Sequence, residues 1–290
     1  MLTIFSVPKP FEGHVGTIQR NAIRSWTALE PACEVILCGD EPGTTRVARD
    51  FGAGTIPDVA CNEFGTPLLD SVFGRVEKQA SNDILCYANA DLILYPDLLE
   101  AVRVAASAFA SFLLVGATTN IDVRDELELG GLHALRARAA ATGALRGDKW
   151  IDYFVFPRGA LGPLPAFAVG RPKWDNWMIW RARSLRIPVV DASPSALVIH
   201  QEHEYGHVPQ ARGARWEGPE GDRNLRLLGP DERVYSLANA TYLLSASGLV
   251  SRPQTIRRRL DNEVVMHEWA LPFYRPIRRT YARVRRVLRL

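Results

Sequence analysis

Strand-like and helix-like segments alternate along the first 120 residues, and this order constrains the fold more than any other feature of the sequence. Apolar runs typical of buried strands occur at 2–8, 33–40, 84–88 and 112–118. Segments with helical periodicity separate or follow them, at 15–29, 44–51, 66–80 and 96–109. Such alternation predicts an α/β fold with a mostly parallel sheet flanked by helices, in which ligands bind beyond the carboxyl ends of the strands.

The second half of the chain is less regular. We expect a strand at 151–159 and a helix within 171–187 that begins near Trp174. Residues 208–233 are rich in glycine, proline and charge, which is typical of a loop. From about residue 232 onward the sequence predicts helices.

Charge is distributed unevenly along the chain. Residues 251–290 contain 11 arginines and three acidic residues, a net charge of +8, whereas the whole chain carries only +3. Within 271–290, seven arginines are interspersed with apolar residues, a composition typical of a helix that lies on an anionic membrane surface. The alternative is a C-terminal helix docked on the body with its arginines in water. We expect no nucleic-acid partner, because nothing besides charge supports one.

The cysteines and the N-terminus indicate a compartment. Cys33, Cys38, Cys61 and Cys86 form no Cys-x-x-Cys pair, so we expect free thiols in a reducing compartment. The N-terminus lacks the basic region and long apolar run of a signal peptide, and no stretch of about 20 residues is apolar enough to span a bilayer. The sequence therefore predicts a cytoplasmic protein, peripheral at the inner face of the membrane if the basic tail binds lipid.

One carboxylate lies between two apolar runs, in a part of the sequence that otherwise predicts a buried core. Asn89 and Asp91 lie between two apolar runs, at the end of a predicted buried strand. A carboxylate in that position stays charged when a cation lies beside it, and Mg²⁺ or Mn²⁺ takes oxygen ligands. Asp91 is therefore a candidate ligand of a divalent metal ion. The alternative is that it ends the strand or caps the helix that begins near Pro96.

The strand that runs into Asn89-Ala90-Asp91 resembles that of the nucleotide-sugar transferases of the GT-A fold, whose corresponding strand runs into an Asp-x-Asp motif. The resemblance covers roughly residues 1–205. It implies that Asp91 binds Mn²⁺ or Mg²⁺ on the diphosphate of a UDP- or GDP-sugar, and that Asn89 contacts the donor. It also implies a Rossmann-like organisation with a GT-A catalytic domain at 1–215 (nucleotide half about 1–120, acceptor half about 121–215) and a loop with a basic helical extension at 216–290.

The segment from Trp174 to His203 resembles the acceptor side of inverting members of this family. Asp175 falls at the position of their catalytic base, and Trp174 replaces their usual glutamate. The resemblance implies that Asp175 takes a proton from the acceptor hydroxyl, while Trp174 and Trp177 offer faces on which sugar rings stack. The alternative is a helix N-cap aspartate with two core tryptophans.

Three histidines lie close together in the sequence Ile-His-Gln-Glu-His-Glu-Tyr-Gly-His. His200 ends its predicted strand, where the resemblance implies a third metal ligand. His203 is the alternative for that role and a candidate contact to the acceptor. His207 reads as a surface loop residue. No Cys-x-x-Cys or His-Glu-x-x-His pattern completes a zinc site.

Four further residues are candidates for the donor or acceptor. The resemblance implies that Asp40, after the second strand, contacts uracil or guanine, and that Arg75 and Lys78 meet the base or phosphates; the alternative for both cations is a solvated helix face. Asp152 begins the strand at 151–159 and is a candidate for hydroxyl groups of the acceptor or sugar. Its alternative is a turn residue.

These features together predict a metal-dependent transferase that moves a sugar from a nucleotide donor to a hydroxyl acceptor, a saccharide or glycoconjugate, with inversion. The first alternative is a retaining transferase, in which Asp175 positions the acceptor. A nucleotidyltransferase would need a glycine-rich loop bearing a lysine after the first strand, and the segment 6–16 has Lys9 but only two glycines. A non-catalytic nucleotide-binding protein is the third alternative.

Overall fold

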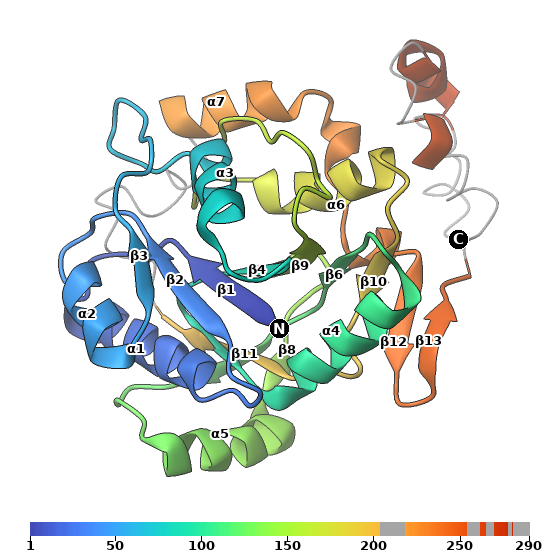
Figure 1. The fold of residues 1–290 in the computed structure, drawn as a ribbon. Helices are drawn as coiled ribbons and strands as arrows, with labels where there is room; N and C mark the ends of the chain where they lie inside the picture. Colours follow the sequence, from blue (N-terminus) through green and yellow to red (C-terminus); the bar gives the residue numbers. More distant parts are fainter. Residues whose placement is uncertain (204–217, 254–261, 265–269, 278–279, 281–290) are drawn as a thin grey trace. The chain divides into compact units, whose positions relative to one another are not determined.

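The computed structural model describes residues 1–203, 218–253, 262–264, 270–277 and 280 (Figure 1). The chain divides into two compact units, Met1–Ser251 and Arg252–Leu290. In the second unit, helical backbone is described at 262–264 and 271–277. Most of the arginines of 271–290, and the histidine at 207, lie outside the described residues.

A large sheet forms the centre of the first unit. Among the described residues it has nine strands, in the order β13 (Gly248–Ser251), β12 (Tyr242–Ser245), β10 (Val189–Asp191), β6 (Leu113–Val115), β9 (Tyr153–Pro157), β4 (Ile84–Ala88), β1 (Leu2–Ser6), β2 (Glu34–Cys38) and β3 (Gly54–Ile56). Neighbours are parallel except at β9, which is antiparallel to β4 and β6, and at β13. The predicted mostly parallel α/β fold is therefore confirmed.

A second sheet brings the histidine strand to the end of β4. Its order in the described chain is β5 (Leu92–Leu94), β11 (Val198–Glu202), β7 (Thr119–Asp122) and β8 (Ala144–Leu145). Strand β11 runs antiparallel to β5, and their register sets His200 opposite Leu92. Because β5 begins directly after Asp91, this pairing places His200 beside that carboxylate.

Helices cover both faces of the large sheet (Figure 1). One face carries α1 (Gly13–Thr27), α2 (Thr44–Phe51) and α4 (Pro96–Ala108), and the other carries α3 (Leu69–Gln79), α6 (Trp174–Ser184) and α7 (Pro219–Leu228). Helix α5 (Leu129–Thr142) packs on the second sheet, where Leu132 and Leu135 join a buried cluster with Ile121 and Ile199.

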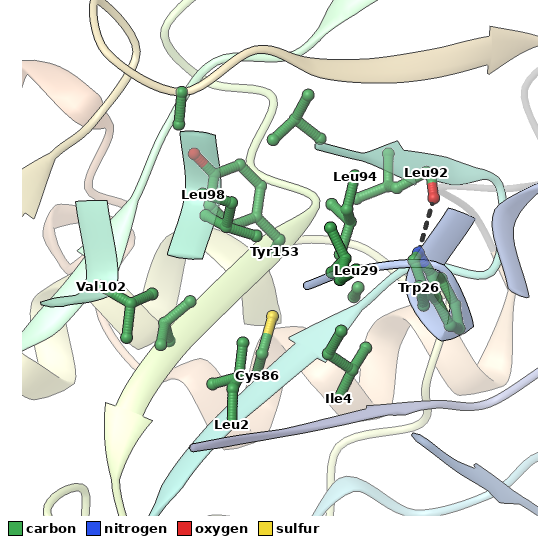
Figure 2. Close-up of a cluster of buried hydrophobic side chains, with 14 of the residues drawn as sticks. Leu2, Ile4, Trp26, Leu29, Cys86, Leu92, Leu94, Leu98, Val102 and Tyr153 are labelled. Carbon is green, nitrogen blue, oxygen red and sulfur yellow. Dashed lines mark hydrogen bonds between the residues drawn. The ribbon is translucent and has the colours of Figure 1, made fainter. Parts of the chain in front are cut away.

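The side chains packed under α1 and α4 are mostly aliphatic, with Trp26 and Tyr153 among them (Figure 2). Ile4 and Cys86 from neighbouring strands pack with Trp26 of α1 and Leu98 of α4. The indole Nε1 of Trp26 donates a hydrogen bond to the carbonyl of Leu92 at 2.8 Å. Each such side chain contributes roughly 1.5–3 kcal/mol by its burial. The core thus fixes α1 against the residue that follows Asp91.

The opposite face of the sheet is aromatic. Phe5 and Tyr87 from β1 and β4 contact Phe73 of α3 at ring-centroid distances of 5.0 and 5.7 Å. Trp174 at the start of α6 contacts Tyr87 at 5.3 Å and Phe154 of β9 at 5.5 Å. Because successive strand residues point to opposite faces, the same strands supply both cores.

Two predictions of secondary structure after residue 208 are wrong. Within the predicted loop, Pro219 begins α7 as its first helical residue and Gly229 ends it. Where helix was predicted, Tyr242–Ser245 and Gly248–Ser251 form the β12–β13 hairpin, because β12 gains a parallel partner in β10.

The predicted helix at 66–80 begins only at Leu69, since Leu68 is held extended by a bridge to Ala168.

Two further predictions concern the state of the cysteines and the absence of membrane-spanning segments. The four cysteines are free thiols, and Cys38 and Cys86 are buried. Within the described residues, no helix combines the length and apolar character needed to cross a membrane.

Candidate active site

A cavity of about 640 Å³ opens at the carboxyl edge of β1 and β4. It is lined by residues 7–10 and nearby residues of α1, by 64–67, 87, 89–91, 146 and 150–152, and by 169–175, together with His200 and His203. Strand β9 is antiparallel, so its amino end reaches the same edge, and Tyr153 pairs with Ala88. The cavity therefore lies where an α/β sheet is expected to bind its ligand.

Asp91, His200 and His203 form a compact group in the lining of this cavity. One potential ligand atom from each lies within 4.8 Å of the others. Asp91 Oδ2 is 3.0 Å from Nε2 of His203 and 3.6 Å from Nε2 of His200. All three side chains are largely buried, with exposed fractions of 18%, 6% and 4%. The structure thus brings together the predicted metal ligands and adds His203 to them.

Two atoms of this group are buried without a hydrogen-bond partner among the described residues, Asp91 Oδ1 and His200 Nδ1. Buried polar atoms are almost always satisfied, so each exception needs a physical reason. A carboxylate and two imidazoles are the donor set of a divalent transition metal. An ion coordinated by Asp91 would account for its unpartnered oxygen.

The charges of the group favour metal binding. Burial raises the pKa of Asp91, but His200, the hydrogen bond with His203 and the charge of Lys9 together bring that pKa well below its usual range. Burial is also the main reason that the pKa of His200 is lowered, against the pull of Asp91. The carboxylate is therefore ionised at neutral pH and the His200 ring is neutral, as metal ligands must be.

Asp152 and Asn89 belong to a second polar group beside the first. Asn89 Nδ2 donates to Asp152 Oδ1 at 3.1 Å, and the two backbones are joined by a 3.0 Å hydrogen bond. Asp152 Oδ2 accepts from Thr118 at 3.2 Å and pairs with the buried guanidinium of Arg146. Burial raises the pKa of Asp152 although Arg146 opposes the rise. Asn89 thus orients Asp152 in the cavity wall.

Asp175 lies in the first turn of α6 and lines the cavity. The residue before this helix, Lys173, adopts a left-handed conformation (φ 71°) and turns the chain into it. Asp175 Oδ1 accepts a hydrogen bond from the backbone N–H of Asn176 at 2.8 Å. The carboxylate thus lies at the positive end of the α6 dipole. The structure therefore places the predicted base in the same cavity as Asp91, His200 and His203.

The two predicted stacking tryptophans differ in position. Trp174 lines the cavity but is only 5% exposed, because Tyr87 and Phe154 pack against it. Trp177 does not line the cavity; it is 4% exposed and packs on Phe167. Both side chains serve as core.

Three predicted donor contacts lie outside the cavity lining. Asp40 is exposed after β2, and its neighbour Glu41 reaches the cavity instead. Arg75 on α3 pairs with Asp58 at 2.6 Å. Lys78 is exposed farther along the same helix.

Sequence reasoning missed several residues of the site. Lys9, Arg146 and Arg171 supply positive charge to the cavity wall, and Trp150 supplies an exposed ring. In the sequence, Lys9 stands out only as part of a segment that matches a nucleotidyltransferase loop poorly. A cation near a predicted carboxylate is not visible in sequence when the two lie far apart along the chain, as for Lys9, whose charge acts on Asp91.

No family model and no curated protein gives a significant match to the sequence. A comparison with solved structures does give significant matches. TarS from S. aureus (residues 1–349, in complex with UDP-GlcNAc) is 14% identical with a TM-score of 0.46, covering 73% of this chain and 61% of that one. Glucosyl-3-phosphoglycerate synthase from Mycobacterium tuberculosis, in complex with Mg²⁺ and uridine diphosphate, is 15% identical with a TM-score of 0.48, covering 88% of each chain.

The same synthase in complex with Mn²⁺ and UDP-glucose is 16% identical with a TM-score of 0.44, covering 72% of this chain and 73% of that one. This chain thus spans about three-fifths of the TarS structure and most of the synthase. At these identities the likeness concerns the fold alone.

Proposed function

We propose that this chain is a metal-dependent glycosyltransferase of the GT-A type, which moves a sugar from a nucleotide-sugar donor to a hydroxyl group of a saccharide or glycoconjugate. The observation that carries the proposal is the joint placement of Asp91, His200 and His203 with the carboxylate of Asp175 around one cavity. The volume of about 640 Å³ is in the range of pockets that enclose ligands of this size.

The residues present fit a divalent cation. Asp91 offers an oxygen, and His200 and His203 offer imidazole nitrogens. This mixed set favours Mn²⁺ over Mg²⁺, which prefers oxygen ligands, and is also compatible with Fe²⁺ or Zn²⁺. A cation held there would neutralise the charge that develops on the leaving diphosphate.

The loop after β1 is proposed to hold the nucleotide diphosphate. Its Lys9 is fixed to α1 by two backbone hydrogen bonds with the side chain of Gln19, at 2.6 and 2.8 Å. The charge of Lys9 already acts on Asp91, so the ammonium group lies within electrostatic range of the proposed metal position. A rigid loop that carries a cation is suited to bind phosphate oxygens. UDP and GDP are the candidate nucleotides.

Asp175 is proposed as the general base of an inverting transfer. Its Oδ1 is engaged by the N–H of Asn176, which sets the direction of the carboxylate. A base positioned in the cavity takes the proton from the acceptor hydroxyl as the oxygen attacks the anomeric carbon. Asp152, paired with Arg146, is proposed to hold hydroxyl groups of the sugar or acceptor. In the retaining alternative, Asp175 would orient the acceptor without removing its proton.

The catalytic machinery is proposed to lie within 1–215, since the cavity-lining residues of the described chain end at His203. Residues 271–290 are proposed to bind an anionic membrane surface, on the strength of their seven arginines. Sedimentation with anionic vesicles tests this, because a chain ending at residue 270 should bind less than the full chain. Equal sedimentation would reject a membrane role.

Thermal unfolding tests the function. We expect UDP or GDP to raise the melting temperature of the native chain when Mn²⁺ is present, and to raise it less without the ion. Mg²⁺, Fe²⁺ and Zn²⁺ complete the metal series. Asp91→Ala should abolish the metal-dependent part of the shift.

The matched control for this test is Asp83→Ala, because Asp83 precedes the same strand with a side chain that is 97% exposed. Its shift should equal that of the native chain. If no nucleotide gives a metal-dependent shift, the proposal is wrong. If the shift is present but no sugar is released from UDP-glucose, GDP-mannose or the other common donors, a nucleotide-binding protein or a nucleotidyltransferase becomes the better description.

A further inference from the structure

Exposed aromatic side chains are confined to one place in the described part of Met1–Ser251. Among its described phenylalanine, tyrosine and tryptophan residues, two are exposed, Phe64 at 54% and Trp150 at 40%. Both line the cavity. Large apolar groups left open to solvent within a cavity mark a surface that binds something. The two rings therefore need a ligand-based explanation, whereas the buried Trp174 and Trp177 do not.

Trp150 is held in place by its neighbours. The guanidinium carbon of Arg146 lies 4.6 Å from the centroid of its ring. Arg146 is itself fixed, because it pairs with Asp152 and its backbone N–H donates to the carbonyl of Thr118 at 2.9 Å. The backbone N–H of Trp150 closes a turn onto Gly147 at 3.0 Å. These contacts hold the ring in place, and it remains 40% exposed with a cation over one face.

The ring also lies next to the proposed acceptor side of the site. Asn176 Nδ2 donates to the carbonyl of Lys149 at 3.1 Å. This hydrogen bond joins Lys149, the residue before Trp150, to Asn176, the residue after Asp175. Two positions farther along, Asp152 is bonded to Asn89 at the donor side. Trp150 therefore stands between the proposed base and the polar group beside the metal ligands.

We propose that Trp150 is the stacking platform for the sugar ring of the acceptor, a role that rests on the function proposed above. The C–H groups on one face of a pyranose are apolar and weakly positive, and the face of an indole is apolar and negative, so the two surfaces are complementary. Stacking would hold the acceptor ring beside Asp175 without specifying its hydroxyl groups. Trp150 is thus a positioning residue that selects saccharide acceptors over acceptors without a ring.

Saturation-transfer NMR tests the platform. The samples contain the full chain with diamagnetic Zn²⁺ or Mg²⁺ and UDP or GDP, and the probes are the methyl α- and β-glycosides of glucose, galactose, mannose and N-acetylglucosamine. We expect at least one glycoside to bind through its ring C–H groups. Trp150→Ala and Trp150→Leu should weaken that binding about tenfold, and Trp150→Phe should retain much of it, because phenylalanine keeps an aromatic face.

The control variant is Leu185→Ala. Leu185 is 41% exposed, almost the same as Trp150, but it lies after the end of α6 and does not line the cavity. It should bind the glycosides as the native chain does. Trp150→Leu keeps an apolar side chain and guards against a folding defect in Trp150→Ala.

Two results would overturn the platform. One is that no glycoside binds the native chain; the other is that Trp150→Leu binds as tightly as Trp150→Phe. The metal-dependent nucleotide shift in melting temperature, measured on the same variants, separates this failure from failure of the proposed function. If the metal-dependent nucleotide shift persists while glycoside binding does not depend on Trp150, only the platform proposal is wrong.

Discussion

Gln201 donates two hydrogen bonds to the backbone carbonyl of Asp91, one from its own backbone N–H at 3.2 Å and one from its side-chain Nε2 at 3.1 Å. Its side chain is completely buried. The same Nε2 donates to the carbonyl of Ile18 at 2.7 Å, and Oε1 accepts from Asn21 at 3.0 Å. One side chain thus joins α1, β11 and the turn after β4, and it holds the backbone of Asp91 beside β11, the strand that carries His200.

We therefore expect Gln201→Leu to weaken the metal site as well as the fold. Leucine has a similar volume but cannot donate, so several buried polar groups lose a partner at a cost of about 1–3 kcal/mol each. Loss of an outer partner of a metal ligand typically lowers metal affinity about 10–100-fold. Mn²⁺ titration followed by electron paramagnetic resonance measures the affinity, and urea unfolding measures the stability.

Gln79→Leu serves as the control for this variant, since Gln79 is exposed at the end of α3. It should leave Mn²⁺ affinity unchanged. A folded Gln201→Leu chain with native Mn²⁺ affinity would show that the backbone of Asp91 needs no such support.

The roles of the two histidines can be separated by single substitutions. Both His200→Ala and His203→Ala should lower Mn²⁺ affinity by about tenfold or more, because each removes one of the proposed ligands. His133→Ala, which changes an exposed residue of α5, is the control. If His203→Ala binds Mn²⁺ normally and only His200→Ala fails, His203 returns to the acceptor contact predicted from the sequence.

Lowering the pH should weaken the contacts by which Glu220 holds α7 in place. Burial raises the pKa of Glu220, but hydrogen bonds from Thr66, Asn62 and Arg171, with the charge of Arg171, outweigh it and lower that pKa. A group with a lowered pKa stabilises the fold above its unfolded pKa of about 4.3, and this contribution is lost as the pH falls through the folded value. Glu220→Gln should thus cost roughly 1–2 kcal/mol at pH 7 and progressively less below about pH 4.3.

Urea unfolding at pH 7 and at about pH 3.5 measures this difference. Asp222→Asn is the control on the same helix, because Asp222 is exposed and solvent screens its charge. A cost of Glu220→Gln that is equal at both pH values would contradict the assignment.

Local patterns explain why much of the fold and part of the site could be predicted. The helices at 44–51 and 96–108 and the strand Ile84–Ala88 appear close to their predicted bounds, since their apolar periodicity and flanking glycine or proline are visible within a few residues. The end of that strand then placed Asp91 at the carboxyl edge of the large sheet, whereas His200 lies inside β11 and not at its end as predicted. That edge is a consequence of parallel pairing and needs no knowledge of long-range contacts.

The remainder depends on tertiary pairing that no local pattern encodes. The strand that carries His200 joins a separate sheet, and this choice of partner creates the contact with Asp91. In the sequence, Trp174 and Trp177 look like stacking residues, yet both are buried in the aromatic core. The exposed tryptophan ring of the cavity is Trp150. The β12–β13 hairpin likewise exists because β10 offers an open edge.

The last prediction concerns Asp175 as the general base. Asparagine keeps the size of the side chain, and its Oδ1 still accepts the hydrogen bond that the N–H of Asn176 makes to Asp175 at 2.8 Å. It cannot take a proton, so sugar transfer in Asp175→Asn should fall by about 10²–10⁴-fold while the metal-dependent nucleotide shift is kept. Asp70→Asn is the matched control, because Asp70 occupies the first turn of α3 and is exposed.

Product stereochemistry decides what a large effect of Asp175→Asn means. A base in this position implies that the acceptor oxygen attacks opposite the leaving diphosphate, so the new linkage must have the inverted anomeric configuration, which the proton coupling constant at C1 reports. A retained configuration would remove Asp175 from the role of base, however inactive its variant. The carboxylate would then orient the acceptor hydroxyl, and the variant would lose acceptor affinity together with turnover, because both depend on the same contact.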